Sequence, residues 1–161
     1  MPLVKSNLVR DFSKFMVPDS EGFEGSPENA EEFADKFSKA INNYAASIVP
    51  PTNPATLPAA TAALKTALMA VGPPFEEAQQ FSFIIPPAML AFATVVGVGM
   101  GTVSGGAIVA VPPTAELGAS IAANLTTLQL ANAPAPECVE EIAGTIDEWF
   151  KTGTASGNPW S

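Results

Sequence analysis

Residues 81–101 read FSFIIPPAMLAFATVVGVGMG, in the middle of a stretch from Ala78 to Ala115 that carries no charged side chain. An uncharged run of this length leaves water by entering a protein core, a subunit interface or a bilayer. Patterns typical of amphipathic helices stand on both sides of it. We therefore expect this stretch to be the spine against which the other helices pack, and we expect Ala91→Asp to cost several kcal/mol.

Three features of the stretch argue against a membrane span. Pro86 and Pro87 interrupt it, and its longest clean part, from Ala88 to Met100, is shorter than the roughly 20 residues that a spanning helix needs. No Lys or Arg lies close to either end to set a topology. A protein that inserts residues 81–111 into a membrane is kept as an alternative.

The composition is that of an acidic chain with few charges. Of the 161 residues, 47% are hydrophobic and 14% are charged, whereas soluble domains usually have about 25% charged residues. The net charge is −9, and no Lys or Arg occurs from Thr66 to Phe150. Nucleic-acid binding requires basic patches, so we expect no nucleic-acid partner, and anionic membrane surfaces are disfavoured. The low charge indicates surface that is hidden against copies of the chain or against other partners.

The chain lacks the side chains that most catalytic and metal sites use. Histidine is absent, which removes the commonest general base and the commonest metal ligand. Cys138 is the only cysteine, so neither an internal disulfide nor a cysteine-rich metal site can form. Without histidine a Ser-His-Asp triad is impossible, and no motif supports a Ser-Lys pair. We expect no enzymatic activity, no catalytic residue and no cofactor.

Two local motifs resemble ligand sites but fail on spacing. GVGMG at residues 97–101 is followed by Thr102 where a dinucleotide-binding loop has its third glycine, and no Lys follows as in a P-loop. Close helix packing or a flexible hinge explains these glycines better. Asp19, Glu21 and Glu24 form an acidic loop whose spacing does not fit an EF-hand. We therefore expect neither a cofactor-binding residue nor a metal-binding residue.

Hydrophobic residues recur at helical spacing in several segments that proline and glycine separate. Residues 107–111 are rich in β-branched side chains and are expected to be extended. The expected helices cover residues 3–17, 26–49, 58–71, 75–85 and 86 to the glycines near 97, with two more that begin at Thr114 and Pro136.

The helix that follows Ser26 has the clearest hydrophobic stripe. Ser26 is expected to cap it, with Pro27 in the first helical position. The stripe predicts that Phe33 and Phe37 lie in the core. The polar side chains of Asp35 and Lys39 are expected at the surface.

The last ten residues, from Thr152 to Ser161, follow no helical pattern and nevertheless include a tryptophan. Two glycines, a proline and small polar side chains leave this segment little means of ordering itself. Trp160 belongs to a residue type that is enriched at interface hot spots. We therefore expect a single helical domain over residues 1–151, followed by a C-terminal tail, residues 152–161, that docks into a partner's pocket.

The segment IDEWFKTGTA at residues 146–155, together with PWS at 159–161, resembles the end of small virion structural proteins of tailed bacteriophages. The helix that contains FADKF at 33–37, and the glycine-rich apolar middle, are similar in layout to the same group. This resemblance implies a short, acidic, helical subunit that assembles in rings or clusters around a head, neck, tail or baseplate. It implies other virion structural proteins as partners and the virion, assembled in the host cytoplasm, as location. No catalytic residue is carried over.

We therefore predict a mainly α fold, with about six helices packed around the central uncharged segment and one short extended segment or hairpin near residues 98–111. The predicted function is that of a structural subunit of a tailed-phage virion, a homo-oligomer that packs against its neighbours in a tail, neck or baseplate assembly. The alternatives are a non-viral oligomeric interaction or scaffold protein and the membrane-inserting protein. The residues expected at the interface are Phe92, Val95, Val98, Met100 and Trp160.

Overall fold

The computed structural model describes residues 2–69, 78–103, 105 and 108–161, with the backbone alone for residues 78–82, 114, 129 and 130. Over this part of the chain six α-helices and three two-residue strands form the fold, so the prediction of a mainly α protein is confirmed. In chain order the elements are α1 (Lys5–Met16), α2 (Ala30–Ala45), the 3-10 helix η1 (Pro54–Thr56), α3 (Leu57–Met69), α4 (Ala78–Val103), β1 (Val109–Ala110), α5 (Thr114–Leu130), α6 (Ala135–Phe150), β2 (Thr154–Ala155) and β3 (Asn158–Pro159).

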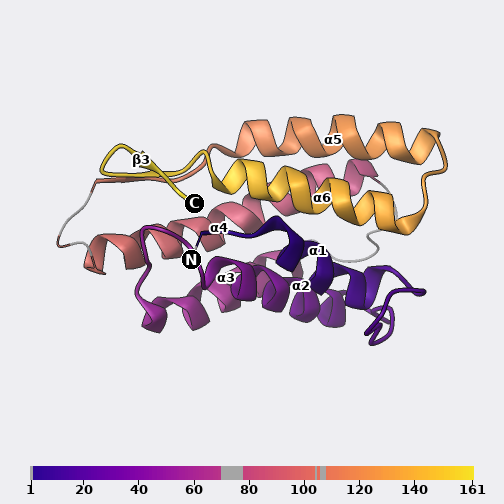
Figure 1. Ribbon diagram of the computed structural model, residues 1–161, viewed down its shortest axis with the longest axis horizontal. Helices are drawn as coiled ribbons and strands as arrows, with labels where there is room; N and C mark the ends of the chain where they lie inside the picture. The colour runs from indigo at the N-terminus through magenta and orange to yellow at the C-terminus, as the bar shows by residue number, and fades with distance from the viewer. Residues whose placement is uncertain (1, 70–77, 104, 106–107) are drawn as a thin grey trace.

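The six helices form a closed ring, in which consecutive helices pack against each other and α6 returns to pack against α1. All of them run roughly along the long axis of the molecule (Figure 1). The ring therefore has one side made of α6, α1 and α2 and an opposite side made of α3, α4 and α5. Its interior is a single core of buried aromatic and aliphatic side chains to which every helix contributes.

Helix α2 begins three residues later than the sequence suggested. Its N-cap is Asn29, not Ser26, and the Asn29 side-chain oxygen accepts a hydrogen bond from the Glu32 N–H at 2.9 Å. The Glu32 carboxylate in turn accepts a hydrogen bond from the Glu28 N–H at 2.9 Å. These two side chains satisfy one backbone donor in the first turn and one just before the N-cap, which is why the helix starts after Asn29.

The predicted hydrophobic stripe of α2 is confirmed. Phe33 and Phe37 are both buried in the core of the ring. Lys39 is exposed and Asp35 is half-buried; the Asp35 carboxylate pairs with the Lys39 ammonium at 2.6 Å and with the Lys65 ammonium at 3.3 Å. Because Lys65 belongs to α3, the second pair joins α2 to α3 at the surface.

The predicted division of residues 75–100 into two helices is wrong over the described residues, because one helix, α4, runs through Pro86 and Pro87; residues 75–77 lie outside the described part. The two prolines have no N–H for the carbonyls of residues 82 and 83, and an interior proline costs a helix about 3 kcal/mol. Burial of large apolar side chains that face the interior of the ring offsets this loss. These side chains are Ile84, Ile85, Met89, Phe92, Val96 and Met100.

The sequence suggested that the glycines near residue 97 end the helix, but α4 continues to Val103. These glycines instead allow neighbouring segments to approach closely. A Cβ atom on Gly99 would collide with the side chains of Thr52 and Thr56. The Asn53 N–H donates to the Gly99 carbonyl at 3.2 Å, and the Thr52 hydroxyl donates to the Val96 carbonyl at 2.8 Å. The absence of a side chain at Gly99 therefore allows the segment before α3 to lie directly on α4.

The C-terminal tail forms a small sheet with its own chain. Strands β2 and β3 pair as a hairpin, and β1 pairs antiparallel with β2, which gives the strand order β1-β2-β3. Ser156 and Gly157 make the two-residue turn with φ values of 51° and 81°, as a type I′ turn requires. The extended segment predicted near residues 107–111 is confirmed at β1.

The expectation that Trp160 docks into a neighbour is corrected, because its indole is buried in its own chain and is 1% exposed. The indole lies against the backbone of Gly153 and beside the ring of Phe150, with 5.9 Å between ring centroids. The backbone N–H of Trp160 donates to the Gly153 carbonyl at 2.8 Å, and Ser161 exchanges two backbone hydrogen bonds with Val49 at 2.6 and 2.9 Å. The hairpin thus returns the end of the chain to the core.

Candidate interaction surface

Charge is divided unevenly between the two sides of the ring. Helices α3, α4 and α5, of 13, 26 and 17 residues, contain two charged residues between them, Lys65 and Glu116. Helices α1, α2 and α6, of 12, 16 and 16 residues, contain four, five and five. The outer surface of the first three helices, formed by their exposed side chains, is here named the α3–α4–α5 face.

One stripe of α4 is exposed along most of its length. Phe83 is 72% exposed and Val98 is 60% exposed. Pro87 and Thr94 lie between them on the same side of the helix, and Thr102 follows one turn after Val98. The helix that fills the core with its inner side therefore presents an uncharged outer side to solvent.

Helices α3 and α5 lie on either side of α4 and continue this surface with mostly small, uncharged side chains. Because few of these side chains are charged or long, little desolvation and little side-chain ordering oppose their burial. The α3–α4–α5 face is therefore a candidate surface for packing against another protein. Besides Glu116, the exposed residues of the two flanking helices are Pro58, Ala59, Ala62, Thr66 and Met69 in α3, and Ala115, Ala119, Ser120, Ala123, Thr126 and Thr127 in α5.

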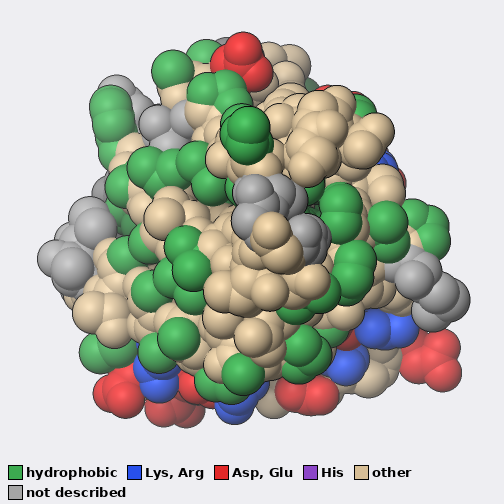
Figure 2. Space-filling view, turned by 90° about the vertical axis from the view of Figure 1, so that its left-hand side faces the viewer, with side chains coloured by type: hydrophobic (Ala, Val, Ile, Leu, Met, Phe, Trp, Pro, Cys, Tyr) green, Lys and Arg blue, Asp and Glu red, His purple; other side chains and the backbone are tan. Residues whose placement is uncertain are grey.

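The apolar surface extends onto the end of the molecule where α4 finishes and the small sheet lies. Ile108, next to β1, is 84% exposed, and Val103, the last residue of α4, is exposed as well. Figure 2 looks onto this end: hydrophobic side chains are spread over it, and charged side chains gather along its lower edge. An exposed apolar surface of this kind makes this end of the molecule a candidate interaction site.

Of the five residues predicted at the interface, only Val98 is exposed on the single chain. Phe92 and Met100 are fully buried in the ring, Trp160 is buried as described above, and Val95 is half-buried against the core. Phe92, Met100 and Trp160 are therefore core residues of their own chain. In a helix where nearly every residue is apolar, the sequence does not show which side faces inward, because periodicity is weak.

Sequence reasoning missed Phe83, Pro87 and Thr94 as members of an exposed surface. A comparison of the number of charged residues in each expected helix would have indicated the surface. The helices that became α3, α4 and α5 nearly lack such residues, whereas the others have four or five each.

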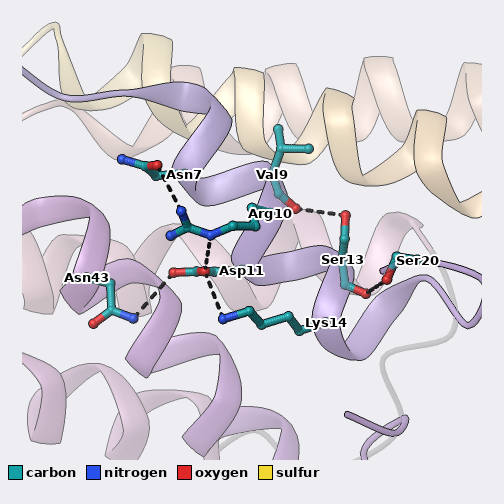
Figure 3. A network of polar contacts seen from close by, with 8 residues as sticks. All are labelled: Asn7, Val9, Arg10, Asp11, Ser13, Lys14, Ser20 and Asn43. Atoms are coloured by element: carbon teal, nitrogen blue, oxygen red, sulfur yellow. Dashed lines mark hydrogen bonds and ion pairs between the residues drawn. The ribbon is translucent and has the colours of Figure 1, made fainter. Parts of the chain in front are cut away.

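On the charged side of the ring, α1 carries a polar network centred on Asp11 (Figure 3). The buried Asp11 carboxylate pairs with the Arg10 guanidinium at 3.0 Å and the Lys14 ammonium at 3.4 Å, and it accepts a hydrogen bond from the Asn43 amide at 3.3 Å. Burial by itself would raise the pKa of this carboxyl, but the bonds from Arg10 and Asn43 and the two positive charges lower that pKa below its usual range. The ionised Asp11 is thus a structural tie between α1 and α2.

Replacing Asp11 with asparagine should lower the free energy of unfolding by about 1–2 kcal/mol at pH 7, because charge-assisted hydrogen bonds are lost. The pKa of Asp11 is lowered on folding, so its contribution is fully present above about pH 4 and is lost as pH falls through the folded value. Urea unfolding at neutral pH and at about pH 2.5 measures this, and the difference between variant and wild type should shrink at low pH.

The matched control for Asp11 is Glu21→Gln, which removes one carboxylate from an exposed loop position. It should change the free energy of unfolding by less than about 0.5 kcal/mol. A loss at Asp11→Asn that stays the same at both pH values would contradict the ionic role of Asp11.

A second buried contact joins α2 to α6. The Tyr44 hydroxyl donates to the Asp147 carboxylate at 2.6 Å, and the Lys151 ammonium pairs with the same carboxylate at 2.7 Å. Burial, together with the hydrogen bond to Asp147 and the charge of Asp147, raises the pKa of Tyr44, so its hydroxyl stays a donor. The charged side of the ring is thus held together by ties within the chain.

One groove of the molecule is lined by polar groups that already have partners. A groove of about 590 Å³ between α2 and α3 is lined by Asp35, Lys39, Asn42, Thr61 and Lys65 among others. The Asp35 carboxylate pairs with the ammonium groups of both Lys39 and Lys65. The Thr61 hydroxyl donates to the Asn42 side-chain oxygen at 3.0 Å. Within the described ranges, no three His, Cys, Asp or Glu side chains come together as a metal ion would require.

By length and composition alone, Phe83–Val103 is a helix long and apolar enough to cross a membrane. The sequence predicts a shorter clean segment, from Ala88 to Met100, because prolines and glycines usually break a helix. In the structure 61% of an 18-residue window within this segment is buried inside the protein, as expected for the core helix of the ring.

No protein-family model matches this chain, and neither does any curated protein or solved structure.

Proposed function

We propose that this chain is a structural subunit of a tailed-phage virion that acts by packing against neighbouring subunits in a tail, neck or baseplate assembly. Its partners are other virion structural proteins and copies of itself, and it works without a catalytic residue or cofactor. The observation that carries the proposal is the α3–α4–α5 face. A nearly uncharged surface on a chain of net charge −9 suits burial against protein.

The way the chain is closed on itself supports a role as a rigid building block. The residues that resemble virion proteins, 146–155 and 159–161, form the end of α6 and the hairpin. Two backbone hydrogen bonds between Ser161 and Val49 fix the C-terminus to the segment that follows α2. A subunit built in this way can transmit contacts through its body without rearranging.

A non-viral scaffold protein is the second candidate, because the α3–α4–α5 face would serve it equally well. Membrane insertion is favoured by the apolar length of residues 83–103. It is opposed by the orientation of α4, since Ile85, Met89 and Phe92 are buried inside the ring and would have to leave it to meet lipid.

The test of the virion proposal is to look for the chain in particles. Particles released by the host that encodes it are purified on a density gradient, and the chain is located by mass spectrometry and immunogold electron microscopy. We expect it in the particle fraction, with label at the tail, neck or baseplate. Particles that contain the other structural proteins but lack this chain would contradict the proposal. Recovery with a host assembly would favour the scaffold, and recovery with membranes would favour insertion.

A further inference from the structure

We infer that the α3–α4–α5 face is a self-association surface, on which two copies of this chain meet with their α4 helices antiparallel about a two-fold axis. The inference rests on the packing role proposed above but not on the virion as the place where packing occurs. Two-fold dimers are the commonest symmetric assemblies, and each copy contributes the same patch to them.

The distribution of charge selects a second copy as the partner. Helix α6 carries five acidic residues and no basic one, so two copies that met through this side would bring like charges together. Four of the basic side chains on α1 and α2 are already paired within the chain: Arg10 and Lys14 with Asp11, Lys36 with Glu32, and Lys39 with Asp35. The α3–α4–α5 face has almost no charge to repel or to be desolvated. Another uncharged face complements it best, and a second copy supplies one.

The size of the face matches what a stable dimer needs. At 1.5 Å per residue, α4 is about 39 Å long, and α3 and α5 are about 20 and 26 Å long. With neighbouring helices roughly 10 Å apart, the three helices together present on the order of 800 Å². A dimer of standard size buries about 800 Å² on each partner.

The exposed side chains suit a protein partner better than lipid. Most of the large apolar side chains of α4 face the ring, whereas Pro87 and Thr94 face solvent between Phe83 and Val98. Small side chains allow two helix backbones to approach closely, while helices that lie on lipid expose large apolar residues with Lys and Arg beside them. Lys65 is the one basic residue of the three helices, and it pairs with Asp35.

A two-fold axis between Ala91 and Thr94 relates the two ends of the exposed stripe of α4. It brings Phe83 of one copy near Gly101 and Thr102 of the other, where small side chains leave room for a ring. Ala91 and Thr94 of both copies meet at the axis itself. Because each contact occurs twice, a single substitution near the axis changes two contacts.

Thr94→Asp tests this inference, because it places two carboxylates at the axis while Thr94 is exposed on the single chain. Ser6→Asp adds the same charge at an exposed position of α1, on the opposite side of the ring, and is the matched control. Sedimentation velocity is run from about 1 to 100 µM, a range in which a micromolar dimer dissociates. We expect wild type and Ser6→Asp to reach twice the 16.6 kDa mass of one chain. We expect Thr94→Asp to raise the dissociation constant at least about tenfold.

A second variant and a folding check keep the result specific. Phe83→Ser removes an exposed ring and should also weaken the dimer, without adding charge. Circular dichroism at the lowest concentration should show the same melting temperature for all variants, because the dimer contributes little to stability there.

Three outcomes would overturn the inference: a wild type that stays monomeric up to about 100 µM, a Thr94→Asp variant that dimerises like wild type, or binding of wild type to neutral phosphatidylcholine vesicles that Thr94→Asp abolishes. The last would make the face a lipid surface. A dimer sensitive to Thr94→Asp in a chain that is absent from virions supports the inference and contradicts the virion proposal. A chain that stays monomeric but is present in virions contradicts the inference and supports the virion proposal.

Discussion

Replacing Trp160 with alanine should lower the free energy of unfolding by about 3–5 kcal/mol. The indole is nearly fully buried, lies against the backbone of Gly153 and packs beside Phe150, so it fills the space between the hairpin and the ring. Its removal loses this burial and leaves a cavity that the packed helices fill only in part. Guanidinium unfolding followed by far-UV circular dichroism measures the change.

Two control variants separate packing of the indole from other effects at the C-terminus. The Trp160 Nε1 is buried and has no hydrogen-bond partner among the described residues. Trp160→Phe should therefore lose less stability than Trp160→Ala, because it keeps an aromatic ring and removes an unsatisfied donor. Asn158 is exposed on β3, and Asn158→Ala should change stability by less than about 0.5 kcal/mol. If Trp160→Ala disturbed assembly alone and left subunit melting unchanged, the tail would be a docking segment after all.

The class of the fold could be predicted because charge and periodicity act locally. The uncharged stretch becomes the core helix α4, and the stripe of α2 is buried as its spacing required. The prediction that Pro86 and Pro87 break the helix was wrong because it considered only the local cost of a proline. Burial of side chains along the whole of α4 offsets that cost, and this burial depends on the other helices. The start of α2 depended on which of two capping residues the chain uses, Ser26 or Asn29, and both suit that role.

The residues of the candidate surface were harder to predict, because nearly every residue of α4 is apolar. In such a helix Phe92 and Val98 look alike in the sequence, and the packing of the neighbouring helices decides that the first is buried and the second exposed. The tail was missed for another reason. Ser156 and Gly157 are a turn dipeptide, but the strands they join have two residues each, which is too short for a strand pattern.

Aspartate in place of Ala93 should lower the free energy of unfolding by at least about 3 kcal/mol, whereas Ala91→Asp should change it by less than about 1 kcal/mol. Ala93 is fully buried in the ring, where a carboxylate loses its hydration. Ala91 is half-buried near the outer stripe, where a carboxylate keeps contact with water. The structure therefore corrects the expectation from the sequence that Ala91 is itself a protected position.

The two variants form a matched pair, because each puts the same side chain into the same helix two residues apart. The loss of helix propensity is similar at both positions, so the difference between them reports burial. Urea unfolding at low protein concentration measures that difference on the single chain, since self-association would stabilise the folded state at higher concentration. Ala91→Asp should then weaken the dimer while leaving the subunit folded, because Ala91 lies beside the proposed axis. Equal losses of stability at the two positions would mean that α4 is rotated about its own axis relative to this structure, and the exposed stripe would have to be redrawn.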